Sequence, residues 1–205
     1  MIAKVGIVGG LGSGKSYISN IFRFKYNIPI YNSDERAKTL MVNDRELRKE
    51  IIKNFGTDSF TSNGNINKQK FNTLLFNNSK LLSLMNSLVV PFIEKDFNVF
   101  CENLRAPYVL KESAIMFETG TYKSLDKIIC IVSDMDTRKK RVMKRDGMSS
   151  DLFLSKVNIQ STDEEKIKKS DFVIYNNNKD LEEQVEKIHI YLLNYHEYYL
   201  GKKNI

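Results

Sequence analysis

The chain has 205 residues, of which 41% are apolar and 28% are charged, and its formal net charge is +7. This composition is ordinary for a soluble globular protein of one domain, and the chain contains no low-complexity segment and no repeat of fixed period. No stretch approaches the ~20 apolar residues that cross a bilayer, and the first ten residues lack the features of a signal peptide. We therefore expect a cytoplasmic protein without a membrane partner.

The excess of positive charge fits either a nucleic acid or a polyphosphate ligand. Lys and Arg are spread along the chain, with one dense stretch at residues 138–145. No helix-turn-helix, zinc-finger or RNA-binding signature accompanies them. The sequence therefore favours a polyphosphate ligand, and no nucleic-acid partner is expected.

Apolar runs of strand length alternate with segments of helical periodicity along the chain. The expected strands are 2–8, 28–34, 107–117, 127–133 and 172–176. The expected helices are 15–25, 34–40, 45–55, 68–103 with a break at Pro91, 135–146, 149–169 as one or two helices, and 181–199, followed by a frayed tail, GKKNI. This alternation predicts an α/β fold in which helices cover both faces of a parallel sheet.

One segment is too long and too helical to be a single crossover between two parallel strands. It covers residues 36–103. We therefore expect one three-layer domain, with a five-stranded core formed by about 1–35 and 105–200 and a helical substrate-binding insert at about 36–104. A lid is expected at about 137–168. Ligands of such sheets bind beyond the carboxyl ends of the strands.

Four of the six residues after Val8 are glycine, directly behind the first expected strand. The stretch Gly9-x-x-x-x-Gly14-Lys15-Ser16 fits the phosphate-binding loop pattern, and it opens a helix, as that loop does. Glycines allow backbone amides to approach a phosphate closely, and the helix adds its positive dipole end. A dinucleotide-binding fingerprint fits less well, because it would need glycine at the position of Lys15.

The loop predicts a P-loop NTPase fold that binds ATP with Mg²⁺. Lys15 is expected to contact the β- and γ-phosphates, and the Ser16 hydroxyl is expected to bind the metal. The residues expected to surround the phosphates are Gly10, Leu11, Gly12, Ser13, Gly14, Lys15, Ser16 and Tyr17.

A phosphate-binding loop identifies the donor but not the acceptor. The chain lacks the N-K-x-D stretch of GTPases and the apolar strand ending in Asp-Glu of DNA-handling ATPases. Small-molecule kinases need a group that orients the acceptor hydroxyl, and Asp34, at the exit of the second expected strand, is the candidate. Asp34 also suits the N-cap of the following helix, and the sequence leaves both roles open.

Kinases also need mobile arginines that cover the transferring phosphoryl group. Arg138, Arg141 and Arg145 follow the fourth expected strand and share one helical face. Arginine suits bidentate phosphate contacts, so we favour a phosphate-facing lid over a merely solvated basic face.

These motifs, in this order, resemble the dephospho-coenzyme A kinase family over nearly the full length. GGLGSGKS resembles the family's GGIGSGKS, and YNSDERAK resembles its second-strand motif, usually D-A-D followed by a helix. Further matching segments are FGTDSFTSNGNINKQKF, KESAIMFETG, VMKRDGMS, Gln160 and DFVIYNN. The ordered set is far more specific than the glycine loop alone.

The resemblance implies roles for individual residues. Asp34 matches the family's proposed base for the ribose 3′-hydroxyl, and Arg141 and Arg145 match its lid arginines. Glu112 occupies an often acidic position that is expected to order Mg²⁺ through water. The expected catalytic residues are therefore Lys15, Asp34 and Arg141, and the expected metal-binding residues are Ser16 and Glu112.

The chain departs from the family pattern at Asn32, Val90, Ala114 and Tyr175. These changes affect expected substrate and adenine contacts rather than the phosphate chemistry. The implied activity is ATP-dependent phosphorylation of dephospho-coenzyme A by a monomer or weak homo-oligomer. The alternatives are another P-loop kinase that acts on a nucleoside or nucleotide, and an ATP-regulated nucleic-acid-binding protein.

Overall fold

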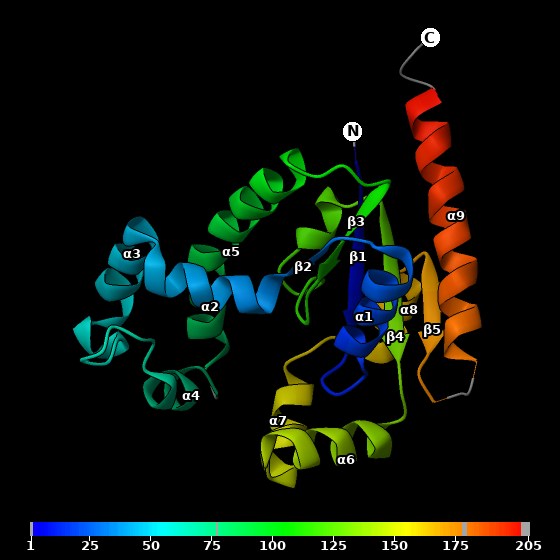
Figure 1. The fold of residues 1–205 in the computed structure, drawn as a ribbon. Helices are drawn as coiled ribbons and strands as arrows, with labels where there is room; N and C mark the ends of the chain where they lie inside the picture. Colours follow the sequence, from blue (N-terminus) through cyan, green and yellow to red (C-terminus); the bar gives the residue numbers. More distant parts are fainter. Residues whose placement is uncertain (1, 77, 178–179, 202–205) are drawn as a thin grey trace. The chain divides into compact units, whose positions relative to one another are not determined.

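A computed structural model describes residues 2–76, 78–177 and 180–201, which form alternating strands and helices (Figure 1). The strands are β1 (Ala3–Gly9), β2 (Ile30–Asn32), β3 (Tyr108–Glu112), β4 (Lys127–Val132) and β5 (Phe172–Tyr175). The helices are α1 (Lys15–Tyr26), α2 (Ser33–Asn43), α3 (Arg45–Phe55), α4 (Lys68–Phe76), α5 (Ser79–Glu102), α6 (Met135–Asp146), α7 (Ser150–Asn158), α8 (Asp163–Lys168) and α9 (Leu181–Gly201), with 3₁₀ turns at Thr57–Ser59 and Thr121–Ser124. Residues 202–205 of the expected frayed tail lie outside the described residues.

The five strands form one sheet in the order β2-β3-β1-β4-β5, and every neighbouring pair is parallel. The central strand β1 is almost completely buried, as expected for a parallel sheet covered on both faces. The predicted α/β class with a five-stranded parallel sheet is therefore confirmed.

Helices cover both faces of this sheet, and alternate residues of β1 point to different layers. Val5 and Ile7 pack in a buried cluster with side chains of α1 and α9. Val8 packs in a second cluster, with Met116 and Cys130, against which Ile167 of α8 is placed. The phosphate-loop pattern lies at the carboxyl end of β1, and α6 and α7 lie beyond the same end of the sheet (Figure 1).

The chain divides into two compact units. One contains the residues up to Asn32 and those from Cys101 onward, and therefore the whole sheet. The other is Ser33–Phe100, which contains α2, α3, α4 and α5 as far as Phe100. Within this helical insert Phe55 and Phe71 meet edge to face, with ring centroids 5.5 Å apart. The Arg48 guanidinium lies 3.8 Å from the centre of the Phe60 ring.

The expected helix break at Pro91 is wrong, because α5 continues through this residue and the interruption lies before Ser79. Proline removes one backbone donor from a helix. The exposed Pro91 is tolerated because α5 buries a stripe at every fourth residue, which keeps one face of the helix packed. This stripe consists of Met85, Val89, Ile93, Phe97 and Cys101.

Two strands are shorter than expected. β2 ends at Asn32, and the next residues, Ser33 and Asp34, belong to α2. β3 ends at Glu112, so Ser113 lies outside the strand. In the described part of the chain, no helix combines the length and apolarity needed to cross a membrane.

Candidate phosphate-binding site

The connection from β1 to α1 is a tight loop. The Ser13 amide donates to the Gly10 carbonyl at 3.0 Å. Gly12 and Gly14 have φ angles of 79° and 94°, in the left-handed region that favours glycine. Gly14 is the N-cap of α1, and no side chain in the described residues caps this helix end. The first-turn amides of α1 therefore keep the character of an anion-binding helix N-terminus.

Neighbouring side chains approach the loop too closely for a β-carbon. A β-carbon on Gly10 would lie 2.1 Å from Nη2 of Arg138, and one on Gly14 would lie 2.0 Å from Nδ2 of Asn176. Packing therefore favours glycine at both positions, and at Gly14 the left-handed backbone conformation favours it as well.

Lys15 folds back over the loop, where its Nζ donates to the Gly9 carbonyl at 3.0 Å. Its ammonium group is therefore held at the loop itself rather than directed away along α1. This position agrees with a role in binding phosphate, which stays a prediction.

Glu112 brings the end of β3 to the start of α1. Glu112 as a whole is 4% exposed. Its Oε1 accepts a hydrogen bond from the Ser16 hydroxyl at 2.6 Å, and its Oε2 accepts one from the Ser19 hydroxyl at 3.1 Å. Hydroxyl and carboxylate oxygens are the hard ligands that Mg²⁺ takes alongside phosphate and water, so Ser16 and Glu112 fit such an ion.

The three arginines of α6 have different surroundings, although they share one helix. Arg138 is 3% exposed, and its Nε donates to the Leu11 carbonyl at 2.9 Å. Arg141 donates to the Ser13 carbonyl at 3.4 Å and to the Asn176 carbonyl at 3.1 Å. A solvated basic face is therefore wrong for the buried Arg138, whereas Arg141 is exposed and also donates to the loop.

Arg145 lies at the exposed end of α6 and forms a two-point ion pair with its neighbour Asp146, at 2.7 and 2.8 Å. This pairing lowers the pKa of the Asp146 carboxyl, so the pair is fully charged at neutral pH. The structure does not bring Arg145 to the loop.

A pocket of about 530 Å³ lies beside the loop. It is lined by Gly14, Tyr17, Asp134, Thr137, Arg141, Asn176, Asn177 and Leu181. The side-chain oxygen of Asn177 accepts hydrogen bonds from the Ser133 hydroxyl at 2.6 Å and from the Asp134 amide at 3.2 Å. The Asp134 carboxylate caps α6 by accepting from the Thr137 amide, and this bond lowers the pKa of Asp134.

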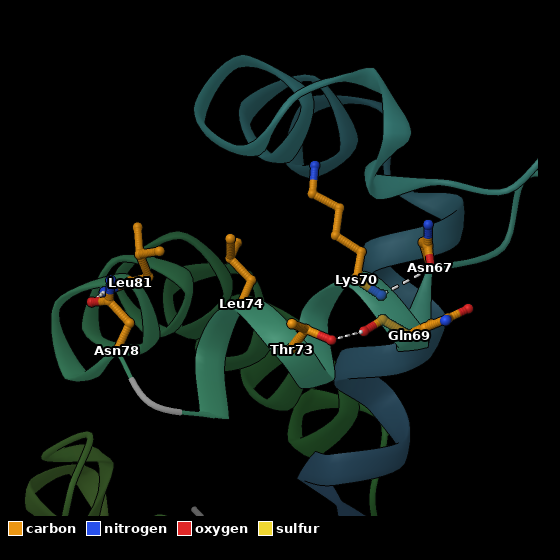
Figure 2. Close-up of a pocket in the computed structure, with 7 residues that line it drawn as sticks. All are labelled: Asn67, Gln69, Lys70, Thr73, Leu74, Asn78 and Leu81. Atoms are coloured by element: carbon orange, nitrogen blue, oxygen red, sulfur yellow. Dashed lines mark hydrogen bonds between the residues drawn. The ribbon is translucent and has the colours of Figure 1, made fainter.

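A second pocket, of about 700 Å³, belongs to the helical insert (Figure 2). Its lining consists of Asn67, Gln69, Lys70, Thr73, Leu74, Asn78 and Leu81. The only charged group among these, the Lys70 ammonium, is bonded to the Phe55 carbonyl and to the Asp58 carboxylate. The pocket thus offers leucines, amides and a hydroxyl rather than a free cation for a polyphosphate.

Asp34 lies in the first turn of α2, within the helical insert. Because α2 begins at Ser33, Asp34 is a first-turn residue rather than the N-cap itself. A carboxylate there interacts favourably with the helix dipole.

Several contacts of the loop were not expected from the sequence. Ser19 holds Glu112, Asn176 donates from Nδ2 to the Ser13 carbonyl at 2.7 Å, and Gln160 accepts from the Leu11 amide at 2.9 Å. A polar residue directly after the apolar run of β5 was the available signal for Asn176. Ser19 lies in α1 and carries no comparable signal of position. Gln160 lies in the turn after α7, and its match to the family pattern does not show that it contacts Leu11.

Comparison with known proteins gives a consistent result. The family model described as dephospho-CoA kinase matches residues 3–182. The dephospho-CoA kinase of Bacteroides fragilis (strain YCH46) is 32% identical over 100% of both chains. That of Fusobacterium nucleatum is 31% identical, covering 91% of this chain and 96% of the relative.

Solved structures agree on the fold. TT1252 from Thermus thermophilus superposes with a TM-score of 0.80 at 25% identity, covering 94% of this chain and 98% of that one. A dephospho-CoA kinase from Campylobacter jejuni gives a TM-score of 0.65 at 24% identity, covering 95% and 98%. Shikimate kinase from Acinetobacter baumannii gives 0.53 at 13% identity, covering 95% and 94%. With a P-loop kinase fold and a family match over nearly its whole length, the chain belongs to the dephospho-CoA kinase family.

Proposed function

We propose that the chain transfers the γ-phosphoryl group of ATP to the ribose 3′-hydroxyl of dephospho-coenzyme A, which gives coenzyme A. The family match over residues 3–182 carries this proposal, because it includes the helical insert as well as the phosphate loop. Other kinases share the loop, so the loop alone would support only a nucleoside triphosphate as donor.

We assign the phosphates of ATP to the loop and its nucleoside to the adjoining pocket of about 530 Å³. Tyr17, the first residue after the loop pattern, lines this pocket. Arg141 lines it too and also donates to the Ser13 carbonyl of the loop. Arg141 is therefore suited to contact a nucleotide where its nucleoside and phosphate parts meet.

Ser16 and Glu112 are the residues proposed to hold Mg²⁺. Because Ser16 donates its hydroxyl hydrogen to Glu112, the lone pairs of its oxygen remain available to a cation. When bound with ATP, the ion supplies positive charge for the transferring phosphoryl group. Ser19 completes the arrangement by holding the second oxygen of Glu112.

Asp34 is proposed to accept the hydrogen bond of the acceptor hydroxyl and to orient it. The support is its match to the family's second-strand motif and its place in the helical insert, two residues after β2 ends. Phosphoryl transfer passes through a loose transition state, so alignment of the hydroxyl matters more than full removal of its proton.

Lys15, Arg141 and Arg145 are proposed to stabilise the charge that develops during transfer, which is the dominant effect in this chemistry. Arg145 must leave Asp146 to do so. An exposed ion pair of this kind contributes only about 0–1 kcal/mol, so its release is a small cost.

The test is an ADP-release assay with purified protein and ATP–Mg²⁺, run in parallel with dephospho-coenzyme A, AMP and RNA. We expect turnover with dephospho-coenzyme A alone and a new 3′-phosphate in the product, identified by ³¹P NMR. Turnover of AMP without dephospho-coenzyme A would establish a nucleotide kinase instead. ADP release that depends on RNA would establish a nucleic-acid-dependent ATPase.

A further inference from the structure

Both polar backbone groups of Leu11, in the middle of the phosphate loop, are bonded to side chains from distant segments. The Leu11 amide donates to Oε1 of Gln160 at 2.9 Å. The Leu11 carbonyl accepts from Nε of Arg138 at 2.9 Å. The loop is therefore held from α6 and from the turn between α7 and α8.

Arg138 is buried in the folded protein rather than exposed to solvent. It is 3% exposed, its Nη1 pairs with Asp163 Oδ2 at 3.0 Å, and its Nη2 fills the space that a β-carbon on Gly10 would take. A guanidinium taken out of water is tolerated only when its charge and its donors are matched. Moving Arg138 toward a ligand would break its bond to Leu11 and leave Asp163 without this partner.

The turn that carries Gln160 is fixed by hydrogen bonds to both backbone groups of the next residue, Ser161. The Ser161 amide donates to Oε1 of Glu118 at 2.6 Å, and the Ser161 carbonyl accepts from Nζ of Lys166. Lys166 is only 1% exposed, and burial lowers the pKa of its ammonium group. Thr162 and Glu165 add a capping box at the start of α8.

A buried ammonium is a costly way to order a surface turn. This cost is explained if the turn must hold Gln160 and Asp163 in fixed places. Gln160 bonds the loop directly, and Asp163 acts on the loop through its ion pair with Arg138. Glycine loses more conformational freedom than any other residue on ordering. A glycine-rich loop that became ordered only when nucleotide arrived would therefore bind more weakly.

We propose that Gln160 and Arg138 are positioning residues, which hold the Leu11 peptide groups and preset the phosphate loop for polyphosphate before it binds. The proposal rests on the proposed function in one respect, that the ligand of the loop is ATP. Neither residue touches the reacting atoms in this role, and neither depends on the identity of the acceptor.

The first test replaces Gln160 with Met, which keeps the length of the side chain and removes the acceptor. Affinity is measured for magnesium pyrophosphate and ATP by calorimetry and for adenosine by NMR titration. We expect pyrophosphate and ATP to bind roughly tenfold more weakly, the loss expected for one hydrogen bond. Affinity for adenosine and the turnover rate at saturating ATP should stay within about twofold of wild type.

The matched control is Asp126→Ala. Asp126 also accepts a hydrogen bond from a backbone amide, that of Lys4 at 2.7 Å, at the opposite end of β1. This variant should leave pyrophosphate affinity unchanged. Equal losses in both variants would indicate general destabilisation, and an unchanged pyrophosphate affinity in Gln160→Met would equally overturn the proposal. A parallel loss of adenosine affinity would place Gln160 at the nucleoside instead.

The second test is Arg138→Lys, which keeps a charge for Asp163 but loses the fork that also reaches Leu11. We expect ATP affinity to fall while the turnover rate at saturation is retained. A turnover rate reduced by about two orders of magnitude, with unchanged ATP affinity, would show that Arg138 acts on the transferring group, against the proposal. Binding of pyrophosphate and ATP requires no acceptor, so the affinity outcomes of both tests stay decisive even if the acceptor is not dephospho-coenzyme A.

Discussion

The phosphate loop and the helical insert differ in the sequence separation of the hydrogen bonds that stabilise each of them. The loop bonds connect residues far apart in sequence, with separations of 149 for Leu11–Gln160, 127 for Leu11–Arg138 and 163 for Ser13–Asn176. In the insert, the Arg48–Gly64 and Lys70–Asp58 bonds span only 16 and 12 residues, and the Arg36–Asp96 pair spans 60. The loop geometry therefore depends on assembly of the whole sheet, whereas much of the insert is fixed by nearby sequence.

This contrast separates two kinds of mutation. Changes at the loop should alter nucleotide binding and chemistry, because the loop is rigidly tied to the fold. Changes in the insert should alter local stability or the acceptor, and should leave nucleotide binding intact.

The largest effect is expected from Lys15→Ala. Removing the charge that lies at the loop should lower the turnover rate by about 10³-fold, comparable to the loss of a strong transition-state donor. The melting temperature should change little, since Lys15 packs no apolar core. Lys25→Ala, in the last turn of the same helix and paired with Glu182, is the control and should stay active. A near-normal rate for Lys15→Ala would refute the assignment of the loop.

Asp34→Asn tests the proposed role of the helical insert in orienting the acceptor hydroxyl. The variant should lower the turnover rate by about 10²-fold, the lower end for a general base, because the loose transition state needs alignment more than proton removal. Affinity for ATP should hold. Glu35→Gln changes the neighbouring acid of the same first turn and serves as the control. If Asp34→Asn reduces only thermal stability, its role is confined to the helix dipole.

The sequence was sufficient for those parts of the molecule that have a local pattern. The β-branched run of β4 and the alternation of strands and helices predicted the sheet, and the spacing of glycines and Lys15 predicted the loop. The continuity of α5 through Pro91 was missed because its buried stripe outweighs one lost hydrogen bond.

The partners of the loop were harder to predict, for a physical reason. Helical spacing placed Arg138 and Arg141 on one face of α6, but spacing does not show what that face packs against. Gln160 and Ser19 reach their partners only after strands and helices far apart in sequence have assembled. Side chains of this kind are specified by tertiary structure rather than by a local motif.

Glu112→Gln tests the hydrogen bonds that Glu112 accepts from Ser16 and Ser19. The amide keeps the shape, but only one of its two terminal atoms can accept hydrogen bonds, so the Ser16 and Ser19 hydroxyls can no longer each donate to a separate oxygen. The concentration of Mg²⁺ needed for half-maximal rate should rise about 10- to 100-fold, as for other groups that orient metal ligands. A metal titration at saturating ATP measures this. An unchanged requirement would limit Glu112 to a structural role.

Lys70→Met addresses the insert alone. The Lys70 side chain is 17% exposed and bonds the Phe55 carbonyl and Asp58, so its loss should destabilise the insert by about 1–3 kcal/mol. Hydrogen exchange should accelerate in α3 and α4 but not in α1. Lys53→Met, at a side chain 76% exposed in α3, is the control. Faster exchange at the loop, or weaker ATP binding, would contradict the separation of the two regions.

The smallest effect concerns pH and the buried Lys166. Burial lowers the pKa of its ammonium in the folded protein below the ordinary value of 10.5, so the unfolded chain binds more protons at pH values between the two. The free energy of unfolding should therefore rise as pH increases through the lowered pKa toward 10.5. Lys166→Met should lack this rise.

Cys130 complicates this measurement, because burial raises the pKa of its thiol from 9.0 to about 11 and so decreases stability as pH rises above 9.0. Urea unfolding from about pH 7 to pH 10 is therefore compared in a Cys130→Ala background, with and without Lys166→Met. A slope that is the same in both chains would mean that Lys166 holds the same number of protons folded and unfolded. Its ammonium would then not be the buried charge that fastens the turn carrying Gln160, and that turn would be ordered by its capping box and Glu118 alone.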